Sequence, residues 1–320
     1  MSPKKPRENS ALEQKINIWI KTHLSRVKMI EKILFINHLK IMVKAGLSLV
    51  EALRILSEEV ENKKLKNIIS EIKSGVEKGN QLSAMLSAYP KIFPSIYVSM
   101  IAAGETAGKM EESLEQVSIQ MKKSHDLNSK IRGALMYPAV ILTAMVGISI
   151  EIVFFVLPKL MIMFDDFNAE LPLPTKILMA VVQFGQNYGI IMLAVIMAIV
   201  IGFYFALKQP YVKKIAHTLY LKLPIFGVII KKINLARFTM TLSSLLESTI
   251  PIIDGVNICS QVTNNVIYRK NLLAVSEALK KGESLSTCLT KYPKTFPPMV
   301  TEMIMVGEQS GKTEDMLREL

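Results

Sequence analysis

The 320-residue sequence has few of the residue types from which catalytic and metal sites are built. It contains two cysteines, four histidines and one tryptophan. Cys259 and Cys288 form no Cys-x-x-Cys pair and have no histidine nearby, so the usual zinc patterns are excluded and two small buried thiols are favoured. The Gly-x-x-x-x-Gly-Lys-Ser/Thr loop of nucleotide-binding proteins is also missing. We therefore expect no catalytic residue, no metal and no cofactor, and predict that the protein is not an enzyme.

Acidic residues are outnumbered by basic ones, 27 to 39, which gives a net charge of +12. A basic chain can bind nucleic acid or an anionic membrane surface. No nucleic-acid-binding motif accompanies the charge, and lysines flank the apolar stretches of the sequence. The charge therefore favours membrane lipids as partners and argues against nucleic acid.

Two stretches are almost free of charge and long enough to cross a membrane, because about 20 helical residues span a hydrocarbon core of about 30 Å. They predict transmembrane helices over 134–158, interrupted by Glu151, and over 188–207. The segment 159–187 between them is an external loop with the lead-in to the second span. Basic residues crowd the outer flanks of both spans, which places both flanking segments in the cytoplasm.

The flanking segments are copies of one another. The segments that start at Gly79 and Gly282 match without a gap, so equivalent residues lie 203 positions apart, the difference between 282 and 79. Chance does not hold one register over such a length, so the sequence contains a duplicated domain. The paired residues are Leu82/Leu285, Tyr89/Tyr292, Pro90/Pro293, Phe93/Phe296, Pro94/Pro297, Gly104/Gly307, Glu105/Glu308, Gly108/Gly311 and Leu114/Leu317.

Each copy has the periodicity of short helices and no run that alternates like a strand. Glycines at 46 and 79 predict helix ends, and Pro94 predicts a helix start. The predicted fold is an all-α membrane protein with two homologous six-helix cytosolic bundles, 34–133 and 208–320, separated by two transmembrane helices. Residues 1–33 form a basic amphipathic segment that either lies on an anionic bilayer or packs on its own bundle.

Polar residues at three places are candidates for a functional role. Glu105 lies between Gly104 and Gly108, and Glu308 lies between Gly307 and Gly311, in equivalent helix–helix turns. Each carboxylate either accepts backbone N–H bonds at the start of the next helix or contacts a motor or a bound cation. Glu151 lies inside the first span, where a carboxylate is costly, so it either contacts a partner helix or extends to the interface.

These motifs resemble the type II secretion system F family, the inner-membrane platform proteins of type II secretion machines and type IV pili. The resemblance rests on the repeated Gly-Glu-x-x-Gly-Lys turn, the Tyr-Pro-Lys-x-Phe-Pro segment and Tyr137-Pro138, and covers residue 35 to the C-terminus. It implies a scaffold that couples a cytosolic assembly ATPase to pilin or pseudopilin polymerisation. It also implies other inner-membrane assembly proteins as partners, a homo-oligomer, and a third transmembrane helix beyond residue 320.

Two other classes of protein compete with this interpretation. A transporter repeats its membrane helices, whereas here the polar segments repeat. A membrane-anchored enzyme needs an active site, and the sequence offers none.

Overall fold

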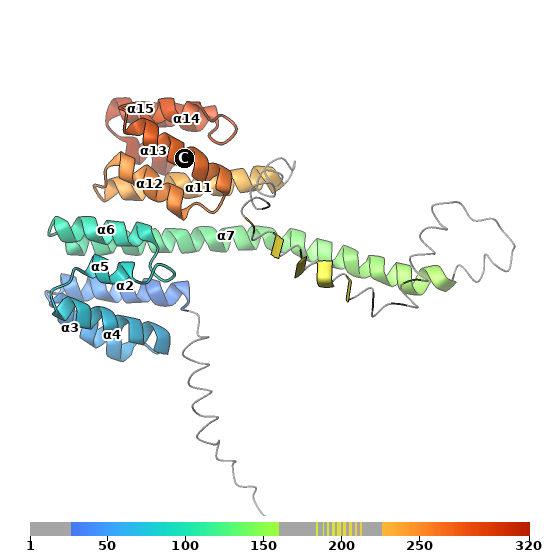
Figure 1. Ribbon diagram of the computed structural model, residues 1–320, viewed down its shortest axis with the longest axis horizontal. Helices are drawn as coiled ribbons and strands as arrows, with labels where there is room; N and C mark the ends of the chain where they lie inside the picture. The colour runs from blue at the N-terminus through green and yellow to red at the C-terminus, as the bar shows by residue number, and fades with distance from the viewer. Residues whose placement is uncertain are drawn as a thin grey trace, which may run out of the picture. The chain divides into compact units, whose positions relative to one another are not determined.

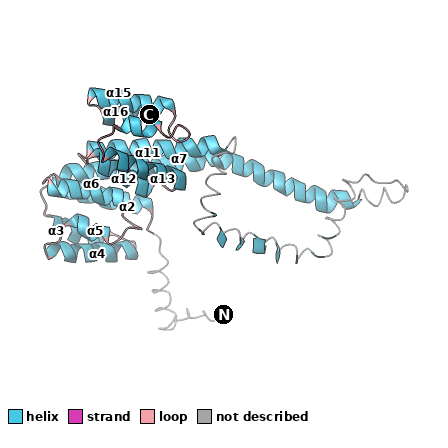
Figure 2. Ribbon diagram, turned by 45° about the horizontal axis from the view of Figure 1, so that its top comes forward, coloured by secondary structure: helices cyan, strands magenta, loops and turns pink. Residues whose placement is uncertain are grey.

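The computed structural model describes residues 27–159 and 226–320, with scattered residues between 184 and 212. Within these ranges the chain is helical and contains no strand (Figure 2). This confirms the all-α prediction for the described residues. Two compact units divide the chain, one formed by 1–126 with 224–320 and the other by 127–223.

The helices of the first repeat are α2 to α6 and the start of α7 (Figure 1). Their bounds are Met29–Lys44 for α2, Leu49–Glu59 for α3, Lys63–Glu77 for α4, Leu82–Ser87 for α5, Ser95–Thr106 for α6 and Met110–Glu151 for α7. Helix α2 begins at Met29, so the last residues of the predicted N-terminal segment belong to this helix; residues 1–26 lie outside the described residues.

Local sequence sets these boundaries as expected. Ser48 and Asn62 cap α3 and α4 by accepting backbone N–H bonds in the first helical turn. Gly46 and Gly79 follow α2 and α4 with φ of 86° and 88°, a left-handed conformation that other residues rarely adopt. Pro94 is the residue from which α6 begins. The predicted glycine stops and proline start are therefore confirmed.

The second repeat has the same order of helices. Its bounds are Phe226–Glu247 for α11, Ile252–Val262 for α12, Val266–Leu279 for α13, Leu285–Thr290 for α14, Pro298–Ser310 for α15 and Thr313–Glu319 for α16. Helices α3 and α12, and likewise α5 and α14, differ by 203 positions at both ends. Asn265, which caps α13, is the equivalent of Asn62. The duplicated sequence thus produces a duplicated succession of helices.

Aromatic pairs mark the same point in both cores. The rings of Phe35 and Phe93 lie 5.9 Å apart, and those of Phe238 and Phe296 lie 5.3 Å apart. All four side chains are buried. Each pair joins the first helix of its repeat to the Tyr-Pro-Lys-x-Phe-Pro segment, which explains why this motif occurs twice.

Helix α7 is 42 residues long and changes character along its length. Its first turns bury Leu114, Val117 and Met121, whereas its later residues are apolar and exposed. A π-helical segment, Ile152–Val156, follows it. By length and composition alone, Met110–Lys159 is the one helical stretch among the described residues that could cross a membrane.

Helix α7 begins at Met110 and continues into the predicted first span, so Pro138 lies inside a helix. The predicted second span and external loop fall mostly outside the described residues, so the arrangement of two bundles and two spans stays a prediction.

Candidate functional site at the Gly-Glu turns

The Gly104–Lys109 turn connects α6 to α7, and its two glycines serve different purposes. Gly108 has a φ of 68°, so it supplies the left-handed residue that ends α6. Gly104 lies within α6, and a Cβ added there would overlap the side chain of Ser113. The Ser113 hydroxyl donates a 2.7 Å hydrogen bond to the Met100 carbonyl, which holds α6 and α7 close.

Glu105 caps a different helix from the one expected. Its carboxylate accepts hydrogen bonds from the backbone N–H groups of Leu82 and Ser83 at 2.6 and 3.0 Å, and from the Ser83 hydroxyl at 2.6 Å. These groups begin α5, which precedes the turn, whereas the sequence argument placed the cap on the helix that follows. The N–H groups of Leu82 and Ser83 lie in the first turn of α5, where a helix offers them no acceptor of its own, so they bind the carboxylate.

The second repeat reproduces this geometry. Glu308 accepts from the N–H groups of Leu285 and Ser286 at 2.6 and 3.1 Å, and from the Ser286 hydroxyl at 2.5 Å. Gly311 has a φ of 67°, and a Cβ added to Gly307 would stand 2.9 Å from the Cα of Thr313. All six residues of the predicted turn sites therefore have a structural role in joining helices.

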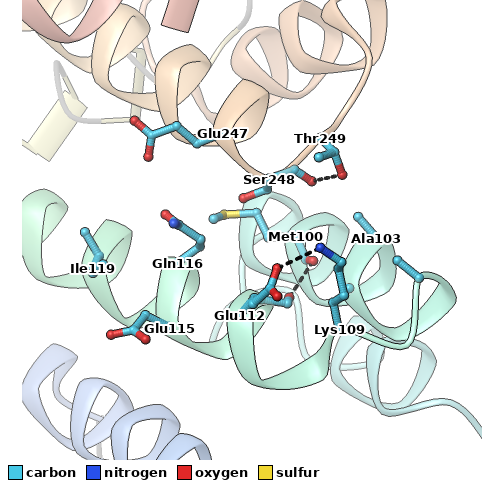
Figure 3. Close-up of a pocket in the computed structure, with 13 residues that line it drawn as sticks. Met100, Ala103, Lys109, Glu112, Glu115, Gln116, Ile119, Glu247, Ser248 and Thr249 are labelled. Carbon is cyan, nitrogen blue, oxygen red and sulfur yellow. Dashed lines mark hydrogen bonds and ion pairs between the residues drawn. The ribbon is translucent and has the colours of Figure 1, made fainter. Parts of the chain in front are cut away.

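The first-repeat turn lines a cavity that also reaches residues of the second repeat. The cavity has a volume of about 330 Å³ and thirteen lining residues (Figure 3). Gly104, Ala107 and Lys109 come from the turn, and Glu247, Ser248 and Thr249 come from the end of α11 and the turn that follows. The remaining lining residues are Met100, Ala103, Glu112, Ser113, Glu115, Gln116 and Ile119.

Each of the three glutamates around the cavity faces a cation. Glu112 pairs with Lys109 at 3.2 Å, as the dashed line in Figure 3 shows. Glu115 pairs with Lys40 at 3.5 Å. Glu247 pairs with Arg318, and this hydrogen-bonded partner raises the pKa of the Arg318 guanidinium. Because each carboxylate is neutralised locally, the cavity is polar without carrying a strong net charge.

Buried polar contacts beside the cavity join the two repeats. The Ser244 hydroxyl of α11 donates a 2.7 Å hydrogen bond to the Gln120 side chain of α7, and both residues are buried. Burial raises the pKa of Tyr97 in α6 to about 12, against the opposing effects of a hydrogen bond to Ser124 and the charge of Arg237. Helix α6 also packs against α12. The repeats therefore meet along α6 and α7 on one side and α11 and α12 on the other.

The cavity is a polar junction between the repeats. Three carboxylates, one lysine and two serines line it, namely Glu112, Glu115, Glu247, Lys109, Ser113 and Ser248. Within the described ranges, no group of three or more His, Cys, Asp or Glu side chains is placed to hold a metal ion. Sequence analysis singled out Gly104 but missed Glu112, Glu115 and Glu247, because nothing in a sequence shows which turns meet in space.

Glu151 is the last residue of α7, its side chain is exposed, and the π-helical segment begins directly after it. The contact between Glu151 and a partner helix in the membrane therefore stays a prediction.

The helices and turns described above are the part of the chain that matches a known family. Residues 35–158 and 238–320 match the family described as type II secretion system (T2SS), protein F. The chain belongs to the type II secretion system protein F family. This confirms the resemblance inferred from the sequence motifs, and the match includes both Gly-Glu turns and Glu151.

Relatives of this T2SS protein F family member carry names from two assembly machines. The chain is 31% identical over its full length to 76% of "Type IV pilus assembly protein PilC" of Myxococcus xanthus. It is 32% identical to "Type II secretion system protein F" of Vibrio cholerae, over 89% of this chain and 70% of that protein. It is also 32% identical to the PilC protein of Pseudomonas aeruginosa, over 91% of this chain and 78% of that protein.

Proposed function

We propose that this protein is an inner-membrane platform of a type IV pilus or type II secretion machine, which couples a cytosolic assembly ATPase to pilin or pseudopilin polymerisation. The observation that carries the proposal is the family membership, with relatives named for pilus assembly and for secretion. The duplicated helical unit and the continuous run of α7 from a polar, packed part into an apolar part support a scaffold. The sequence has no nucleotide-binding loop through which it could use ATP, so a separate ATPase supplies the energy for assembly.

Deletion and complementation test this function. Loss of the gene should abolish pilus assembly or secretion, and the wild-type gene should restore it. Co-purification from membranes should recover the assembly ATPase and pilin or pseudopilin subunits. Intact assembly in the deletion strain would overturn the platform function. Recovery of the complex without the ATPase would contradict the proposed coupling of the ATPase to polymerisation.

We place both repeats in the cytoplasm because basic residues flank the predicted spans. Cysteine labelling from outside intact cells tests this topology. Lys78 and Lys281 are equivalent exposed residues after α4 and α13, so Lys78→Cys and Lys281→Cys form a matched pair. Neither should be labelled, whereas Asn168→Cys in the predicted external loop should be. Labelling of Lys78→Cys and Lys281→Cys without labelling of Asn168→Cys would show that the repeats lie outside the cytoplasm.

We keep Glu151 as a proposed polar contact with a partner helix in the membrane, because a carboxylate inside an apolar segment is costly unless it meets a protein or water. Glu151→Gln preserves most hydrogen-bonding capacity and should retain assembly, whereas Glu151→Leu should lose it while the protein still inserts. Equal assembly by Glu151→Leu and wild type would show that the glutamate has no such contact.

The Gly-Glu turns are proposed to act mainly through structure, because both carboxylates are already used by α5 and α14. Contact with the ATPase or with a bound cation is the alternative for Glu105 and Glu308. Charge reversal that leaves folding intact but weakens ATPase co-purification would support that contact.

A further inference from the structure

A second cavity lies within the first repeat, between α4 and the Tyr-Pro-Lys-x-Phe-Pro segment that follows α5. Its volume is about 550 Å³, inside the range of roughly 300–1,000 Å³ that small-molecule sites usually occupy. It shares no lining residue with the cavity at the Gly-Glu turn. It is therefore a separate site, and it is large enough for a small organic ligand.

Two lysines line this cavity without being neutralised. Lys64 belongs to the first turn of α4, and Lys91 belongs to the segment after α5. Neither forms an ion pair with a carboxylate of the described residues. By contrast, Lys73 further along α4 pairs with Glu77 at 3.6 Å. The cavity thus offers two ammonium groups that are available to an anion.

The rest of the cavity wall is mainly apolar or aromatic. Ile68 and Ile92 line it and are 7% and 8% exposed. Tyr89 adds a ring whose hydroxyl donates a hydrogen bond to Glu71, which holds the ring in place. The Ile92 carbonyl accepts a 2.7 Å hydrogen bond from the Lys32 ammonium, so a third lysine lies next to this wall. Positive charge beside an apolar and aromatic surface suits a ligand with an anionic group and an apolar or planar part.

The second repeat differs at the equivalent positions. Ile68 and Ile92 correspond to Asn271 and Thr295, and the Asn271 amide donates a 2.8 Å hydrogen bond to the Thr295 hydroxyl. This bond ties α13 to the following segment where the first repeat has an apolar wall. The equivalent of Lys64 is an isoleucine, so one of the two lysines is also missing. The two copies share the order of helices but not these residues, so the fold of the repeat does not require the lysine pair or the apolar wall.

We propose that the cavity binds a small organic phosphate. Lys64 and Lys91 hold the phosphate group, and the apolar or planar part of the ligand lies against Tyr89 and the two isoleucines. Lysine suits this task because its ammonium is a compact charge with three donors. A free nucleotide and the headgroup of a phospholipid both offer this chemistry. The proposal does not depend on the platform function, because it rests on the first repeat alone.

Isothermal titration calorimetry of the full-length chain in detergent tests the site. The ligands are ADP, glycerol 3-phosphate and inorganic phosphate. Lys64→Gln together with Lys91→Gln should raise the Kd of the organic phosphate at least about tenfold, the loss expected when hydrogen bonds to a charged group are removed. Asn67→Glu places a carboxylate in the cavity wall, three residues from Lys64 on α4, and should weaken binding similarly. Helicity by circular dichroism should not change, since none of these three side chains is buried.

A matched double variant of the second repeat is the control. Lys270 and Lys294 are exposed, and they are the equivalents of Asn67 and Lys91. Lys270→Gln together with Lys294→Gln removes the same amount of charge as the first-repeat pair but should leave the Kd unchanged. Equal losses in the two double variants would show a general attraction of a basic chain for anions and would overturn the proposal.

The order of the affinities identifies the source of the phosphate. Tighter binding of ADP than of glycerol 3-phosphate would assign the cavity to a nucleotide, and the reverse order would assign it to a phospholipid headgroup. Binding of neither compound, or binding of inorganic phosphate as tightly as both, would overturn the proposal. A Kd that is unaffected by the Lys64→Gln and Lys91→Gln pair would also overturn it.

Discussion

The Ser83 hydroxyl donates a 2.6 Å hydrogen bond to the carboxylate of Glu105. The equivalent bond from Ser286 to Glu308 is 2.5 Å long. Each bond ties the end of one helix to the start of a helix more than twenty residues upstream. The residue-by-residue recurrence shows that this contact belongs to the fold of the repeat itself.

Removing this carboxylate should destabilise the protein. Glu105→Ala leaves two backbone N–H groups and a hydroxyl without their acceptor, so the free energy of unfolding should fall by about 2–3 kcal/mol. Glu308→Ala should have a similar effect. Glu112→Ala is the control, since its ion pair with Lys109 is exposed and should contribute less than about 1 kcal/mol. Urea unfolding in detergent measures the difference, and equal effects at Glu105 and Glu112 would contradict the capping role.

The helical glycines of the two turns should not tolerate a side chain. Gly104→Ala forces a Cβ into Ser113 and should cost about 1–3 kcal/mol of stability. Gly133→Ala is the matched control, because a Cβ there meets nothing within 4 Å and alanine favours a helix, so stability should rise by up to about 1 kcal/mol. Thermal unfolding of both variants checks the opposite signs.

Thr249 is the one non-glycine residue with a positive φ, 60°, in the described part of the chain. Its equivalent in the first repeat is Gly46. A left-handed conformation costs a side chain about 1–2 kcal/mol, and glycine offsets part of the gain by its freedom in the unfolded chain. Thr249→Gly should therefore stabilise the protein by about 0.5–1 kcal/mol, and Gly46→Thr should destabilise it. A lower melting temperature for Thr249→Gly would indicate that the threonine side chain is needed at the cavity.

Stability should fall in alkaline solution because of the buried tyrosines. Burial raises the pKa of Tyr97 and of Tyr268 from 10.0 to about 12. A group that keeps its proton longer when folded contributes its full stability below the unfolded pKa and loses it as pH rises towards the folded pKa. The free energy of unfolding should thus decline between pH 10 and 12, by about 1.4 kcal/mol per pH unit for each tyrosine. Tyr97→Phe should flatten this decline, and an unchanged slope would show that Tyr97 titrates normally.

Local features of the sequence were sufficient to predict much of the fold. Gly46, Gly79 and Pro94 mark helix boundaries because their backbones permit or forbid particular conformations regardless of what surrounds them. The duplication was also readable, since an offset of 203 residues needs no structure to detect. By contrast, the bounds of the first span stay a prediction, because α7 continues without a break from Met110 through Pro138 and its backbone does not mark where an apolar segment begins.

The sequence alone was enough to predict the helical class, the two repeats, the Gly-Glu turns and the family. Which helix Glu105 caps, and which residues of each repeat are buried, became visible in the three-dimensional structure. Capping and burial depend on groups that the fold brings together from distant positions. Ile96 and Met299 are equivalent in sequence, but Ile96 is 5% exposed and Met299 is 68% exposed. A duplicated sequence specifies the same domain twice, whereas the packing of one copy on the other makes their surroundings different.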